Sequence, residues 1–262
     1  MKAPVHSLIS VLALILLPTI ARANEPPTDF LLIPVAASHG HDSVGATWST
    51  TVSFVYTGEG GSSIFSEGFV APRTLLAGER GVIEINAAGA KFGPGVIIHI
   101  TGFPTPKELH AQSYVYNDAR PEVGVAIPGI RLLNDLTANQ TIHLLGIPIN
   151  ATSRTLVRIY AMPITAPGVT DTDVRVHVFD SVGRSLATDI VHLVSPPIVS
   201  IETSTYQPAY AEYRPAVDPA KNSSISIDLE PLPVSGFGRA IWAFATTTSA
   251  SSDSVTAVFP AK

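Results

Sequence analysis

The chain of 262 residues contains no cysteine. This absence excludes disulfide bonds, cysteine-ligated zinc, iron–sulfur clusters and a cysteine nucleophile. Charged residues make up only 14% of the chain, and acidic residues outnumber basic ones by 21 to 16. A nucleic-acid partner would need a basic face. We therefore expect no nucleic-acid partner and no cofactor that depends on cysteine ligands, and no other cofactor motif is present.

Long hydrophobic runs are absent as well, except for one near the start of the chain. An uncharged stretch from Leu8 to Leu17 follows Lys2 and precedes an Ala-Arg-Ala sequence that ends at Ala23. This order is typical of a secretory signal peptide with cleavage after Ala23. A membrane-spanning helix would need about 20 apolar residues. We predict a signal peptide over residues 1–23 and a mature chain without a transmembrane segment, located in the periplasm or outside the cell.

Cleavage would change both the length and the charge of the protein. The signal contains two basic residues, Lys2 and Arg22, and no acidic one, so the mature chain keeps 14 basic against 21 acidic residues. Its net charge of −7 favours solubility outside the cell. A mature chain that begins at Asn24 is long enough for two domains, and without disulfides it must be held together by core burial.

Short runs rich in valine, isoleucine, threonine, tyrosine and phenylalanine recur through the mature chain and predict β-strands. In Thr51–Tyr56 the apolar side chains fall mainly on every second residue, which places them on one face of a strand. The predicted runs are Phe30–Ala36, Thr47–Tyr56, Gly81–Ile85, Val96–Thr101, Gln112–Tyr116, Thr141–Gly146, Thr155–Tyr160, Val174–Phe179, Ile190–Val194, Ser224–Leu229, Ala240–Thr246 and Ser254–Phe259.

The fold class follows from many short strands without intervening helices, a pattern typical of sandwiches and barrels. A membrane barrel would need longer strands and aromatic girdles, whereas aromatic residues are few here and 22 prolines interrupt the runs. We predict an all-β protein with two immunoglobulin-like β-sandwich domains in tandem. A polar break around Asn134 and Asn139 places the first domain at 24–137 and the second at 138–262.

Three pairs of segments in the two halves look weakly alike, and they occur in the same order. They begin at Trp48 and Ser153, at Phe92 and Phe237, and at Gln112 and Asp253. A duplicated sandwich would produce this order, and so would chance similarity between β-rich sequences.

Several of these segments also resemble uncharacterised secreted tandem immunoglobulin-like β-sandwich modules of soil bacteria. The similarity implies an extracellular tandem sandwich, and it transfers no catalytic residues. The segments that carry it are Leu32-Ile-Pro-Val-Ala-Ala-Ser, Gly45-Ala-Thr-Trp-Ser-Thr, His143-Leu-Leu-Gly-Ile, Ser153-Arg-Thr, Val174-Arg-Val-His-Val-Phe-Asp-Ser-Val-Gly-Arg-Ser-Leu and Ala243-Phe-Ala-Thr-Thr-Thr-Ser-Ala-Ser-Ser-Asp-Ser.

A tight turn is predicted inside the longest of these segments. Asp180 favours the start of a turn because its carboxylate bonds to nearby backbone, and Gly183 supplies a positive φ. A calcium loop would need several carboxylates at alternate positions. The sequence therefore predicts a hairpin between two strands.

Two histidines form the cluster with the most chemical character. His39 and His41 are two residues apart, share a face of an extended segment, and carry imidazoles that bind Cu(II), Zn(II) or Ni(II). Asp42, His99 or His110 could supply a third ligand. The alternative is a polar loop between strands.

Three tyrosines mark the longest segment without a clear strand, Thr203 to Ser224. Tyr206, Tyr210 and Tyr213 offer large contact areas, and the prolines between them stiffen the segment before binding. We predict that this loop recognises a partner, or alternatively that it is a crossover packed on the sandwich.

The function predicted from these features is non-enzymatic. The chain would be a secreted module that binds an extracellular protein or a glycan, or that serves a structural or adhesion-like role. One alternative is an exported metal-binding protein that uses His39 and His41. Another is a carbohydrate-active enzyme, which would need two carboxylates about 5–9.5 Å apart in an aromatic groove. No catalytic residue can be assigned from the sequence.

Overall fold

The computed structural model shows an all-β protein. Strand accounts for 71% of the residues that the structure describes, and these contain no helix. None of them therefore forms a helix long and apolar enough to cross a membrane. The predicted signal peptide lies outside the described residues, which are 28–37, 39–41, 46–58, 61–66, 70–83, 95–102, 109–131, 135–163, 171–194, 208–232, 239–249 and 254–261.

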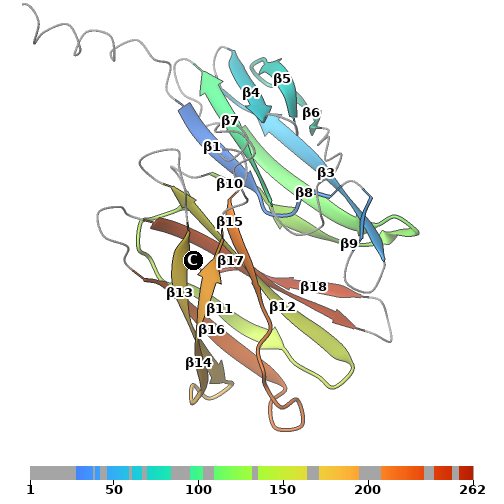
Figure 1. Ribbon diagram of the computed structural model, residues 1–262. Helices are drawn as coiled ribbons and strands as arrows, with labels where there is room; N and C mark the ends of the chain where they lie inside the picture. The colour runs from blue at the N-terminus through green and yellow to red at the C-terminus, as the bar shows by residue number, and fades with distance from the viewer. Residues whose placement is uncertain are drawn as a thin grey trace, which may run out of the picture.

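Eighteen strands in these ranges pair antiparallel to form four sheets (Figure 1). Sheet A has the order β10-β1-β7-β4-β5, and sheet B has the order β2-β3-β8-β9 with β6 paired to β3. Their strands are β1 (Thr28–Ile33), β2 (Gly40–His41), β3 (Thr47–Tyr56), β4 (Ser62–Ser66), β5 (Val70–Leu75), β6 (Arg80–Ile83), β7 (Val96–Gly102), β8 (Leu109–Asn117), β9 (Arg120–Pro128) and β10 (Ile130–Arg131).

The other two sheets come from the second half of the chain. Sheet C has the order β11-β16-β13-β14, and sheet D has the order β15-β12-β17-β18. Their strands are β11 (Ile142–Pro148), β12 (Ser153–Pro163), β13 (Thr172–Asp180), β14 (Ser185–Leu193), β15 (Ala209–Tyr213), β16 (Ser224–Pro231), β17 (Arg239–Ser249) and β18 (Val255–Val258).

Each of the twelve runs predicted from the sequence overlaps a strand, so these predictions are confirmed. The sequence missed β2, β4, β5, β9, β10 and β15. Two of them carry residues that usually interrupt strands: Pro72 in β5, and Pro121 and Gly124 in β9. Pairing with a neighbouring strand overrides this local preference.

The order of strand pairing is the same in the two halves of the chain. With β2 and β10 set aside, sheet A has the order β1-β7-β4-β5 and sheet B the order β6-β3-β8-β9. Sheets C and D repeat these orders as β11-β16-β13-β14 and β15-β12-β17-β18. Each of the eight remaining strands in the first half therefore has a counterpart at the same place in the chain order of the second half.

The repeat suspected from the sequence agrees with this order at only one of its three points. The segments at Trp48 and Ser153 lie on β3 and β12, which correspond. The second pair leads into β7 and β17, whereas the counterpart of β7 is β16. The third pair joins β8 with β18, whereas the counterpart of β8 is β17. The two wrong matches arise because alternating apolar residues look alike in any strand.

Each half has one apolar core, which lies between its two sheets. The core between sheets A and B includes Leu31, Ile98 and Phe54, and the core between sheets C and D includes Val176, Ile227 and Ile159. In β13 the burial alternates, so that Val174, Val176 and Val178 face inward while Arg175 and His177 face outward, as the sequence predicted.

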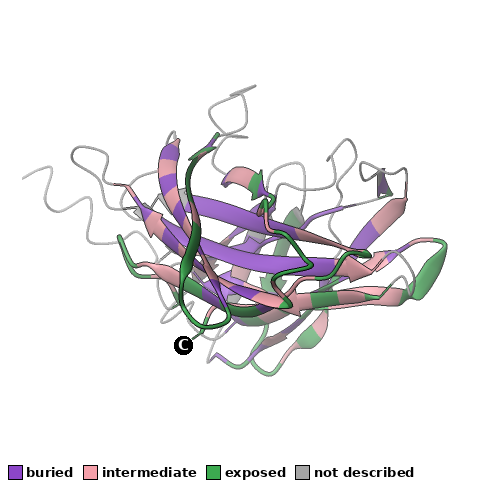
Figure 2. Ribbon diagram, turned by 90° about the horizontal axis from the view of Figure 1, so that it is seen from below, coloured by how far each residue is buried: buried purple, intermediate pink, exposed green. Residues whose placement is uncertain are grey.

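A third core joins the two halves. It forms where the other face of sheet D packs against β1, β7 and the neighbouring ends of β8, β9 and β10. Its members are Leu32, Val35, Ile97, Val115, Ile127, Ile130, Tyr160, Ala240, Trp242 and Phe244. Sheet D is thus buried on both faces, and buried segments are concentrated in the centre of the molecule (Figure 2). Burial on both faces accounts for the continuous apolar run Ala-Ile-Trp-Ala-Phe-Ala in β17.

Aromatic rings make up much of this third core. The Tyr160 and Phe244 rings are nearly parallel, with centroids 6.4 Å apart, and Trp242 lies 5.4 Å from Phe244. The Tyr160 hydroxyl donates a hydrogen bond to the carbonyl oxygen of Pro34 in the first half. Burial raises the pKa of this phenol, so it stays protonated as the donor.

We expect Phe244→Ala to weaken the whole protein rather than one half. Removing a buried phenylalanine typically costs about 3–5 kcal/mol, and this ring belongs to a core that both halves share. Denaturant unfolding should show a single transition in the wild type and a lower midpoint in the variant. Leu145→Ala, at a side chain that is 55% exposed, is the control and should change stability by about 0.5 kcal/mol or less. Equal midpoints for the two variants would contradict the shared core.

The predicted hairpin between β13 and β14 is confirmed. Asp180 Oδ1 accepts hydrogen bonds from the backbone N–H groups of Val182 and Arg184, at 3.0 and 2.9 Å. Gly183 has a φ of 84°, a conformation that favours glycine. The backbone bond from Arg184 lowers the pKa of Asp180 most; burial opposes this effect, and the Arg184 side chain adds to it.

This shift predicts how stability depends on pH. Because the pKa of Asp180 is lower in the folded state, its ionised form stabilises the fold above the ordinary value of 3.8, and this contribution is lost as the pH falls through the folded pKa. The destabilisation caused by Asp180→Asn, measured by denaturant unfolding, should be largest near neutral pH and shrink below pH 3.8. A pH-independent difference would contradict this assignment.

Candidate functional site

The histidines predicted to bind a metal are only partly described. His39 adopts a φ of 53°, and its Nδ1 lies 2.6 Å from Oδ2 of Asp118. Burial of Asp118 raises its pKa, but hydrogen bonds from Ser49 and His39 outweigh this effect and leave the pKa lowered. The side chain of His41 and all of Asp42 lie outside the described residues, within which no group of three metal-ligating side chains occurs. The metal site therefore stays a prediction.

The tyrosines predicted to recognise a partner occupy a strand rather than a loop, so the expectation of no strand in this segment is wrong for Ala209–Tyr213. Tyr210 packs 5.2 Å from the ring of Tyr160, and its hydroxyl donates to Oε1 of Glu212 at 2.7 Å. The Tyr213 hydroxyl donates to Oδ2 of Asp189 at 2.6 Å. Burial is the main cause of the raised pKa of both phenols.

These contacts place Tyr210 in the core shared by the two halves and Tyr213 in the core between sheets C and D. Tyr206 lies outside the described residues. Recognition through the three tyrosines stays a prediction, and the described contacts of two of them serve packing.

Histidine–carboxylate pairs join neighbouring strands on the outer face of sheet C. His143 Nδ1 lies 2.7 Å from Oδ1 of Asp228, and His192 Nδ1 lies 2.7 Å from Oδ1 of Asp173. The side chains of both pairs are between 31% and 60% exposed. Exposed pairs of this kind contribute about 0–1 kcal/mol, so they add little to the alignment of the strands.

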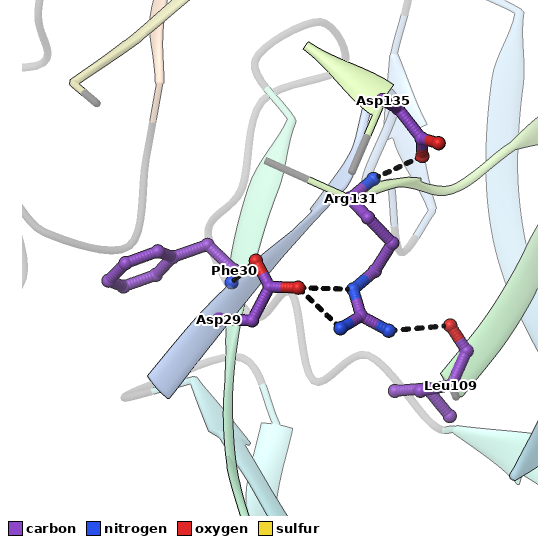
Figure 3. Close-up of polar contacts among 5 residues, drawn as sticks. All are labelled: Asp29, Phe30, Leu109, Arg131 and Asp135. Carbon is purple, nitrogen blue, oxygen red and sulfur yellow. Dashed lines mark hydrogen bonds and ion pairs between the residues drawn. The ribbon is translucent and has the colours of Figure 1, made fainter. Parts of the chain in front are cut away.

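Arg131 and Asp29 form a buried ion pair. The guanidinium of Arg131 binds Oδ2 of Asp29 through Nε and Nη2, and its Nη1 donates to the carbonyl oxygen of Leu109 at 2.9 Å (Figure 3). The backbone N–H of Arg131 donates to Oδ2 of Asp135 at 2.7 Å, and Asp29 accepts the backbone N–H of Phe30. Both charges are satisfied internally, and the contacts tie β1, β10 and the start of β8 together. This cluster is therefore structural.

Arg131→Met should be strongly destabilising, because it leaves the Asp29 carboxylate buried without a counter-ion. Breaking a buried pair from one side typically costs about 3–5 kcal/mol. Arg175→Met is a matched control, since Arg175 pairs with Glu230 at 2.7 Å on the surface, where loss of a pair costs about 0–1 kcal/mol. Chemical denaturation measures both values, and a loss at Arg131 no larger than at Arg175 would refute the structural role.

The outer face of sheet B is the exposed surface best suited to a ligand. We define the sheet B face as Thr51, Ser53, Val82, Gln112, Tyr114, Tyr116, Gly124 and Ala126. Strand register brings them side by side in rows: Tyr114 lies between Thr51 and Ala126, and Gln112 lies beside Ser53. None of the eight residues is charged, and the nearest charged residues are Arg80, Glu122 and Asp118, each two positions beyond the face along the chain.

Two tyrosines form the centre of the sheet B face. The rings of Tyr114 and Tyr116 are nearly parallel, with an interplanar angle of 19° and centroids 5.9 Å apart. Tyr114 is 37% exposed, and its hydroxyl donates to the carbonyl oxygen of Pro121 at 3.2 Å.

Glycine at position 124 makes room for the ring of Tyr114. The tip of the Tyr114 ring passes over Gly124, where a Cβ would lie 2.7 Å from Cζ of the tyrosine. The contact with Gly124 and the hydrogen bond to Pro121 hold Tyr114 in place.

Alternation within β8 is the sequence signal for this face. Tyr114 and Tyr116 lie within the predicted strand Gln112–Tyr116, where Ser113 and Val115 alternate with them. Both Ser113 and Val115 are buried, so the tyrosines occupy the outward phase of the strand. Which phase faces solvent depends on the partner sheet and cannot be read from β8 alone.

Comparisons with known proteins are negative: no protein family, curated protein or solved structure matches this chain.

Proposed function

We propose that this chain is a secreted, non-enzymatic protein of two immunoglobulin-like β-sandwiches in tandem, which binds a partner outside the cell through the sheet B face. The observation that carries the proposal is the pre-arranged pair of Tyr114 and Tyr116 on the exposed, uncharged sheet B face. Tyrosines supply large contact area at a low cost in conformational entropy, and residues fixed before binding reduce that cost further.

The repeated strand order supports the tandem arrangement. In immunoglobulin folds strands B and E belong to one sheet, and strands C, F and G belong to the other. In the second half, β11 pairs with β16, while β12, β17 and β18 pair in the other sheet. In the first half, β1 with β7, and β3, β8 and β9, do the same. The resemblance to secreted bacterial modules and the N-terminal signal pattern support secretion.

The experiment compares mature protein, residues 24–262, with a Tyr114→Ser/Tyr116→Ser variant on a panel of immobilised neutral polysaccharides, anionic polysaccharides and purified exported proteins. We expect at least one panel member to bind the wild type and to lose about tenfold or more of its affinity with the variant, as for loss of a binding hot spot. Tyr114→Phe/Tyr116→Phe retains both rings and should keep most of the affinity.

A matched control removes apolar side chains from another exposed surface. Leu145 and Ile190 are 55% and 63% exposed in the second half of the chain, and Leu145→Ser/Ile190→Ser should bind like the wild type. The proposal is wrong if no panel member binds, or if the tyrosine and control variants bind equally. Release of soluble sugar from a polysaccharide would instead support the carbohydrate-active enzyme.

A further inference from the structure

The chemistry of the sheet B face indicates one class of ligand. Thr51, Ser53 and Gln112 are exposed hydroxyl and amide groups that lie beside the tyrosine pair. Such groups both donate and accept hydrogen bonds. Gly124 and Ala126 are small, and the Tyr114 ring lies over Gly124 on the β9 side of the face. The face therefore combines aromatic rings with neutral hydrogen-bonding groups around them.

A sugar ring presents the complementary arrangement. A pyranose carries weakly polar C–H groups on its faces and hydroxyls around its rim. The face of an aromatic ring is electron-rich and attracts such C–H groups, while the rim hydroxyls meet donors and acceptors like those of Thr51, Ser53 and Gln112. The Tyr114 and Tyr116 rings are nearly parallel with centroids 5.9 Å apart, and together they form one aromatic surface for an extended chain of sugar rings.

The charge of the protein and of the sheet B face favours an uncharged ligand. The protein carries a net charge of −5, and the sheet B face contributes no positive group that would offset it for an anionic ligand. An acidic protein with an uncharged face disfavours polyanions at long range. A neutral polysaccharide meets no such repulsion.

A protein partner is the less suitable occupant. Protein interfaces are usually centred on a desolvated cluster of large apolar side chains. On the sheet B face, Val82 is the one exposed large aliphatic side chain, whereas Leu145, Leu186, Ile190 and Val194 are exposed in the second half of the chain. A face with two aromatic rings among small polar residues is better suited to a sugar than to the apolar centre of a protein interface.

We infer that the sheet B face binds neutral polysaccharides, with Tyr114 and Tyr116 stacking against successive sugar rings and Thr51, Ser53 and Gln112 bonding their hydroxyls. This inference rests on the proposed function, because it names the ligand class of the same surface. It predicts that aromatic rings at positions 114 and 116 are required and that their hydroxyls are not.

Affinity electrophoresis of mature protein in native gels tests the ligand class. The probes are hydroxyethyl cellulose, which is neutral, carboxymethyl cellulose, which has the same backbone with negative charges, and galactomannan, a second neutral polymer. We expect at least one neutral polymer to retard the wild type, and the charged cellulose to retard it less than the neutral cellulose if that backbone is bound. Tyr114→Ser/Tyr116→Ser should lose about tenfold or more of the affinity.

Two variants separate stacking from misfolding. Tyr114→Phe/Tyr116→Phe should keep most of the retardation, because the rings remain although Tyr114 loses its hydrogen bond to Pro121. Leu145→Ser/Ile190→Ser should also be retarded, because those side chains lie outside the sheet B face. Loss of retardation in either variant, or retardation of the serine variant like that of the wild type, would overturn the inference.

The outcomes distinguish the inference from the proposed function. If a purified protein of the panel binds through the two tyrosines and no neutral polymer does, the ligand class is wrong and the binding function stands. Stronger retardation by the charged cellulose than by either neutral polymer would likewise overturn the neutral class. If nothing binds through the tyrosines, both are wrong.

Discussion

Tyr160, Trp242 and Phe244 lie on the face of sheet D that points away from sheet C, and they pack against Leu32 and Ile97 of the first half. The centre of sheet D is therefore covered on both sides, and the sheet acts as a shared middle layer. A chain without cysteine has no covalent cross-link between its halves, so burial of these rings is the main force that joins them. Aromatic side chains suit this role because each buries a large apolar area.

This shared layer also determines which surfaces remain for binding. Both faces of sheet D are buried in apolar cores, and part of the outer face of sheet A is buried in the third core. The outer faces of sheets B and C are left to solvent. Sheet C carries paired charges, such as His143 with Asp228, whereas the centre of sheet B carries neutral groups and two tyrosines. This difference between the two faces is the reason why the binding site is proposed on sheet B.

Strand positions were largely predictable because alternation within a strand is local information. The runs around Thr51, Val176 and Ile227 identified their strands from side-chain pattern alone. Strands such as β5 and β9 were missed because their residues favour turns, and long-range pairing decides their conformation. The same reason explains the wrong prediction of a loop around Tyr210 and Tyr213, because pairing with β12 makes that segment a strand.

The sequence by itself determined the all-β class, the absence of disulfides, the Asp180 hairpin and the inward phase of strands such as β13, since these depend on residue type and near neighbours. Only the tertiary structure decided that β17 is buried on both faces, that Arg131 meets Asp29 across 102 positions, and that Tyr114 and Tyr116 face solvent. Each of these requires residues far apart in the chain to meet, and the position of the second sheet, which no local pattern encodes, decides which face of a strand is buried.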